Sequence, residues 1–174
     1  NYNTTDTQDP GTATIGASDG WVAQTVAVKG ATTTFMGTSS VDPLPFTIAP
    51  GSTATTVNAF TFKTNGGSDT ITDMTISHVN ASSTSLIEIT SADGATVYGS
   101  TTTTVGTSSV ITLDQNTLTA TSGETVYKIR ITPKTNAALP TGIYSSLIPV
   151  TATVFSWTGT NPAVGTDYAF PIII

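Results

Sequence analysis

The sequence predicts an all-β protein, and three observations support this class. Hydroxyl side chains supply most of the polarity: 40 of the 174 residues are Thr and 17 are Ser, while only 9% are charged, against about 25% in an average globular domain. Thr is β-branched and favours strands. No stretch shows apolar residues at helical spacing without Thr, Gly or Pro interrupting it. Short alternating segments recur instead every 8–12 residues or so, as in a sandwich or barrel of about nine or ten strands.

The strongest strand signal lies in residues 123–161, where two alternating segments flank a connector rich in turn residues. Tyr127, Ile129 and Ile131 share one face of the first segment, and alternate residues of 144–154 share one face of the second. Period-two alternation is typical of half-buried strands. We therefore expect a hairpin that forms the centre of the scaffold.

The other expected strands follow the same pattern along the chain. Phe60 and Phe62 share one face of their segment, and Met74, Ile76 and His78 share one face of theirs. N-G-G-S-D at 65–69 and D-G at 93–94 predict turns between strands. We expect strands at 21–28, 32–36, 53–64, 70–80, 85–90, 95–98, 110–113 and 168–174.

Proline and isoleucine mark two unusual strand positions. Pro149 falls inside the second alternating segment, which predicts an edge, a bulge or a change of sheet there. The chain ends in F-P-I-I-I at 170–174, an apolar strand that needs burial in the fold or against a neighbour.

The first thirty residues differ in composition from the rest. Residues 1–20 hold almost no apolar side chain, and the alternating segment 21–28 follows, so we expect an extended arm at 1–30 and one antiparallel β-sandwich domain at 31–174. The segment 21–28 is either the first strand of its own domain or a strand donated to a neighbouring copy. In the second case the side chains that fill the neighbour's groove are Trp21, Val22, Val26 and Val28.

Charge and composition indicate which partners the protein does not bind and where it is located. The net charge is −6 with no basic stripe, which argues against nucleic acid. No apolar run reaches about 18 residues, so we expect no membrane span. Low charge and abundant Ser and Thr favour an extracellular protein, and the absence of Cys is compatible with secretion at this length. We expect a processed mature protein or an excised domain.

Four short motifs carry a family resemblance that covers about two thirds of the chain. The region 46–161 resembles immunoglobulin-like β-sandwich modules of secreted bacterial and archaeal surface proteins, and also strand-donating pilins. These motifs are structural, so the resemblance implies an immunoglobulin-like fold and a surface location rather than a chemical activity. They are N-G-G-S-D at 65–69, I-T-P at 131–133, L-P-T-G-I-Y at 139–144 and W-T-G-T-N at 157–161.

No catalytic constellation emerges from the sequence, and we predict that the protein is not an enzyme. His78 is the single histidine and falls on the apolar face of its strand, where a partly buried or edge position is expected. A Ser-His-Asp triad would need this ring accessible beside a Ser and a carboxylate. Most acidic residues sit at predicted turns, and Glu88 in mid-strand is expected to be exposed.

The sequence also offers candidates for two further kinds of site. No cofactor is expected, but Asn65, Asp69 and Asp73 around a Gly-rich loop could supply oxygen ligands to calcium. Asn3 and Asn80 each begin an N-glycosylation triplet, which makes the chain a possible glycoprotein.

Taken together, the residues favour a structural role. We expect a secreted, pilus-like filament subunit that assembles head to tail with copies of itself by donor-strand complementation. The alternative is a carbohydrate-binding or adhesive module that recognises surface glycans. That alternative requires an exposed aromatic row, for which Trp157 at the end of the long strand is the best candidate.

Overall fold

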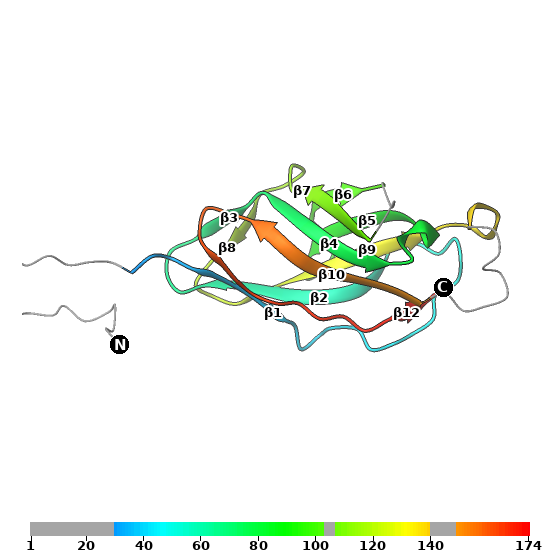
Figure 1. The fold of residues 1–174 in the computed structure, drawn as a ribbon, viewed down its shortest axis with the longest axis horizontal. Coiled ribbons are helices and arrows are strands. Elements are labelled where there is room, and N and C mark those ends of the chain that lie inside the picture. Colours follow the sequence, from blue (N-terminus) through cyan, green and yellow to red (C-terminus); the bar gives the residue numbers. More distant parts are fainter. Residues whose placement is uncertain (1–29, 103–106, 140–148) are drawn as a thin grey trace, which may run out of the picture. The chain divides into compact units, whose positions relative to one another are not determined.

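The computed structural model describes residues 30–102, 107–139 and 149–174. The chain divides after Ala31, and the compact unit Thr32–Ile174 holds every described strand (Figure 1). The described part is all-β, with two short 3-10 helices, η1 (Ala81–Ser83) and η2 (Asn136–Ala138). Its strands are β1 (Thr34–Thr38), β2 (Thr55–Thr64), β3 (Asp69–Ile71), β4 (Asp73–Val79), β5 (Thr84–Ser91), β6 (Val97–Thr101), β7 (Ser108–Thr112), β8 (Leu118–Ala120), β9 (Thr125–Pro133), β10 (Pro149–Thr158), β11 (Ala163–Gly165) and β12 (Ile172–Ile173).

The largest sheet has six strands in the order β11-β1-β2-β9-β5-β6. Its pairs are antiparallel except β1 and β11, which run parallel. The expectation of a purely antiparallel sheet was therefore wrong at this edge. The sequence pattern does not reveal β11, because it is three residues long and all three are exposed, so it shows no alternation.

The second sheet has four strands in the order β12-β10-β4-β7. The expected hairpin within 123–161 was wrong, because β9 pairs with β2 and β5 whereas β10 pairs with β4 and β12. Strands β9 and β10 therefore belong to different sheets, although they follow one another in the described part of the chain.

Two strands predicted as single segments differ in detail. The segment 70–80 is broken at Thr72, so that β3 pairs with β8 while β4 continues into the four-stranded sheet. The Thr72 amide donates to the Thr158 carbonyl at 2.9 Å, and the Thr72 carbonyl accepts from the Leu113 amide at 2.7 Å. Pro149 lies where the described part of β10 begins, and it pairs with Ile173 of β12.

The core lies between the two larger sheets and confirms the predicted inward faces. Residues from β2, β9 and β5 meet residues from β4, β7 and β10 in one apolar cluster. Each large side chain buried there contributes roughly 1.5–3 kcal/mol to folding. The fully buried members include Phe60, Phe62, Met74, Ile76, Ile87, Ile89, Ile111, Ile129 and Ile131, and Tyr127, Val150, Ala152 and Val154 are nearly so.

The apolar C-terminus is buried within its own fold. Ile172 is fully buried and Ile174 is 7% exposed. β12 pairs with the described start of β10. The Ile173 amide donates to the Phe46 carbonyl, and the Ile173 carbonyl accepts from the Ile48 amide. The final segment therefore begins in the six-stranded sheet as β11 and ends in the four-stranded sheet as β12.

Candidate functional site

The residues predicted to form the donor strand lie outside the part of the chain that the structure describes. This holds for Trp21, Val22, Val26 and Val28, and also for Asn3. Asn80, the second glycosylation candidate, lies at the end of β4, where it is exposed and has a φ of 54°. Asn tolerates this left-handed conformation better than most residues. Asn80 is therefore at the surface, as a glycan acceptor must be.

His78 lies on the inner face of β4 and is 2% exposed. Its Nε2 lies 2.9 Å from the Ser109 hydroxyl, while its Nδ1 is buried without a hydrogen-bond partner. Burial lowers the pKa of His78, which favours the neutral ring. A catalytic triad needs a carboxylate at Nδ1 and access for a substrate, and His78 has neither in this structure.

Glu88 is not the exposed strand residue that the sequence suggested. It lies directly opposite Arg130 on the neighbouring strand β9, and the two side chains are 3.3 Å apart. The Glu88 side chain is only 13% exposed. The pair is a cross-strand ion pair on the outer face of the sheet, and Arg130 also donates to the Gly94 carbonyl at 3.1 Å.

Two of the three calcium candidates, Asp69 and Asn65, accept hydrogen bonds from the chain itself. Asp69 is 1% exposed and accepts hydrogen bonds from the Thr34 hydroxyl at 2.5 Å and from the Thr160 amide and hydroxyl at 2.6 and 2.7 Å. Burial alone would raise the pKa of Asp69, but these donors outweigh it and lower the pKa. The Asn65 side-chain oxygen accepts from the Thr33 amide at 2.8 Å. Asp73, the third candidate, begins β4 on its outward face.

Trp157 does not head an exposed aromatic row. Its ring is partly buried and packs edge-on against Phe62, with ring centroids 5.2 Å apart. The exposed aromatic side chains of the described part are Phe155, 75% exposed at a bulge in β10, and Tyr168, 59% exposed. Tyr168 packs against Phe170 rather than against Phe155.

A strand donated by another copy can bind only at a sheet edge whose backbone groups are not already covered. One side of the molecule is closed where β6 meets β7: a Cβ on Gly99 would lie 2.3 Å from the Thr112 carbonyl oxygen, so the two strands touch. On the other side, β10 continues beyond its pairing with β12. There, backbone groups of β10 that face away from β4 bond to side chains instead of to a strand. Asn58 donates to the Ala152 carbonyl, and Asp167 accepts from the Val154 amide.

The edge strand β11 is the open end of the six-stranded sheet. It pairs with Thr34–Met36 of β1, and no described strand follows it on the outside. All three of its residues are exposed, Val164 to 49%. An unpaired, exposed edge is a template for an added strand.

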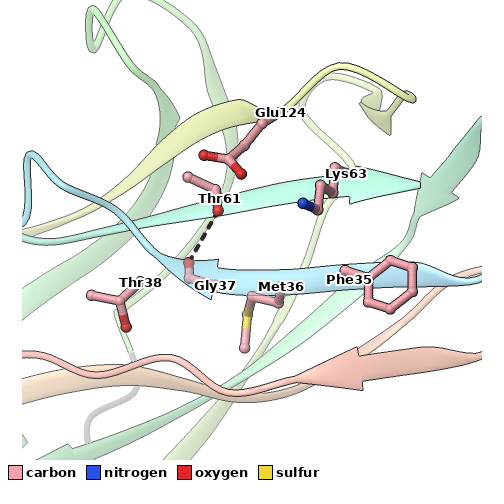
Figure 2. A pocket seen from close by; sticks show the side chains of 7 residues that line it. All are labelled: Phe35, Met36, Gly37, Thr38, Thr61, Lys63 and Glu124. Carbon is pink, nitrogen blue, oxygen red and sulfur yellow. Dashed lines mark hydrogen bonds between the residues drawn. The ribbon is translucent and has the colours of Figure 1, made fainter. Parts of the chain in front are cut away.

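A hollow of about 300 Å³ lies one strand in from this edge, over β1 and β2. Phe35, Gly37, Thr61, Lys63 and Glu124 contribute to its lining, together with Met36 and Thr38 (Figure 2). Gly37 leaves room in it, since an added Cβ there would meet only the Thr61 hydroxyl, at 3.4 Å. The lining combines one aromatic ring with one residue of each charge and suits a mixed polar and apolar segment.

Sequence reasoning missed both the edge and the hollow. Neither β11 nor Gly37 stands out in the sequence, because their role depends on which strands become neighbours. No family model and no curated protein matches the chain. Across the described ranges, no helix is long and apolar enough to span a membrane, and no three His, Asp or Glu side chains cluster as metal ligands.

Proposed function

We propose that the protein is a structural subunit of an extracellular, pilus-like filament, in which each copy donates a strand to the next. The observation that carries the proposal is the exposed edge strand β11 beside the hollow over β1 and β2. The donor is the alternating segment 21–28, whose Trp21 and valines supply side chains for such a hollow. An interface between two different surfaces of identical copies builds an open chain when its rotation does not close.

The environments of the residues that could carry chemistry support a scaffold rather than a catalyst. His78 is buried, Glu88 is paired with Arg130, and Asp69 is held by threonines. The immunoglobulin-like sandwich suggested by the sequence is part of this proposal, with two sheets enclosing one core. Low charge and abundant hydroxyl groups fit the extracellular location.

A single lysine at the edge tests where the donated strand binds. Val164→Lys places a charge on β11, and lysines on edge strands discourage the pairing of further strands. Because Val164 is 49% exposed, the fold should be retained. We expect the protein concentration needed for filament formation to rise at least about tenfold, equivalent to about 1.4 kcal/mol. Sedimentation of assembled protein measures it, and circular dichroism checks folding.

Val110→Lys is the matched control, since Val110 is 64% exposed on β7 of the other sheet. It should assemble as the wild type does. Gly37→Val fills the hollow without touching β11 and should weaken assembly as well. Normal assembly of Val164→Lys together with loss in Val110→Lys would place the acceptor edge on the four-stranded sheet and contradict this assignment.

A further inference from the structure

A buried acidic cluster lies beside β10, where the strand continues past β12. Its centre is Asn58, which is fully buried and follows a register shift between β2 and β9. The Asn58 amide nitrogen donates to the Ala152 carbonyl at 2.7 Å and to Asp167 Oδ2 at 2.6 Å. Because both partners can only accept, the side-chain atom that faces them is the amide nitrogen. The other terminal atom of the Asn58 side chain is therefore the oxygen, Oδ1.

Two carboxylates complete the cluster, and each uses only one of its oxygens. Asp167 Oδ2 also accepts from the Val154 amide at 2.9 Å, and Asp42 Oδ1 accepts from the Ala59 amide, next to Asn58, at 2.9 Å. The remaining oxygens, Asp42 Oδ2 and Asp167 Oδ1, are buried without a hydrogen-bond partner, and so is Asn58 Oδ1. Three such acceptors on residues linked in this way are unusual, because each buried group without a donor costs about 1–3 kcal/mol.

We propose that Asp42, Asn58 and Asp167 bind a divalent cation, Ca²⁺, through these three free oxygens. The donor set is all oxygen and carries two negative charges, which is what a hard cation prefers. Calcium takes about six to eight oxygens in flexible geometry, so carbonyl groups and water complete its shell. This site is separate from the Asn65, Asp69 and Asp73 group considered from the sequence.

The two carboxylates of the cluster lie close enough to influence each other electrostatically. Burial, with a smaller contribution from the nearby Asp42 carboxylate, raises the pKa of Asp167 to about 6. Burial also raises the pKa of Asp42. In the described part, the basic side chain within ion-pair distance of a carboxylate is Arg130, which pairs with Glu88. A bound cation would offset both carboxylate charges and satisfy the three oxygens at once.

Calorimetric titration of the full chain with CaCl₂ at neutral pH tests the site. We expect one Ca²⁺ per chain with a dissociation constant of about 10⁻⁴–10⁻³ M, the range of extracellular modules. Asp42→Asn and Asp167→Asn should each weaken binding at least about tenfold, as losing even an outer-shell partner can. Asp114→Asn, at an exposed turn, should bind as the wild type does.

A measurement on the unaltered protein keeps the proposal testable if a variant misfolds. In a ¹⁵N-correlated spectrum, CaCl₂ should shift the side-chain NH₂ signals of Asn58, with saturation at the calorimetric midpoint. Absence of a saturable signal up to about 10 mM CaCl₂ would overturn the proposal. Binding unchanged in folded Asp42→Asn and Asp167→Asn would overturn it too, as would a proton shared by the two carboxyl groups at neutral pH with no Ca²⁺ uptake.

Discussion

Asp69→Ala is expected to lower the free energy of unfolding by about 3–5 kcal/mol. The carboxylate links three parts of the chain, because it accepts from Thr34 on β1 and from Thr160 after β10 while lying on β3 itself. Alanine removes the acceptor and leaves three donors, two of them on Thr160, without their partner. Urea unfolding followed by circular dichroism near neutral pH measures the loss.

The pH dependence of this effect follows from the lowered pKa of Asp69, which hydrogen bonds from Thr34 and Thr160 hold down against the effect of burial. The ionised carboxylate stabilises the fold above the ordinary pKa of 3.8, and this contribution disappears as the pH falls through the lower folded value. The wild type and Asp69→Ala should therefore converge in strong acid. Asp114→Ala, at an exposed turn, should cost less than about 0.5 kcal/mol. A similarly small loss in Asp69→Ala would contradict the role of Asp69.

Asp167→Asn is expected to raise the free energy of unfolding, in contrast to Asp69→Ala. We expect an increase of about 1–2 kcal/mol near pH 8 in the presence of a chelator. The folded-state pKa of about 6 exceeds the ordinary 3.8, mainly because the group is buried. Between these values the folded protein holds the extra proton, so stability falls as the pH rises through this window and remains reduced above it. Asparagine cannot ionise and avoids that loss.

The substitution preserves the existing hydrogen bonds. The asparagine oxygen can accept from the Val154 amide and from Asn58, and its NH₂ group replaces an oxygen that has no donor. Near pH 4 the carboxyl group is protonated, so the advantage should vanish. Urea unfolding at both pH values measures it, with Asp114→Asn as the control. A less stable Asp167→Asn protein near pH 8 without cations would contradict this interpretation.

The sequence predicted the core well, because apolar and polar residues alternate along a strand that is buried on one face. Phe60 and Phe62, and likewise Ile129 and Ile131, fall on one face in the sequence and are buried together in the structure. The all-β fold class was predictable as well, because abundant Thr and alternating segments favour strands over helices. The position of His78 also followed from its apolar strand neighbours.

Pairing between distant segments was not predictable in the same way. β9 and β10 are consecutive among the described strands, yet β9 pairs with β2 and β5 while β10 pairs with β4 and β12. Alternation contains no information about this choice of partner. The same holds for Asp167, which the sequence places near an ordinary turn but the fold places against Asn58, 109 positions away. The parallel strand β11 was missed because it is short and exposed on all three residues.

The central claim is assembly by strand donation, and negative-stain microscopy of two purified proteins tests it most directly. The full chain and a variant lacking residues 1–30 are compared at micromolar concentration, with circular dichroism to confirm that both are folded. The proposal predicts filaments from the full chain and folded, dispersed particles from the truncated protein. Filaments of equal abundance from the truncated protein would contradict the proposal, because assembly would then proceed without the donor segment.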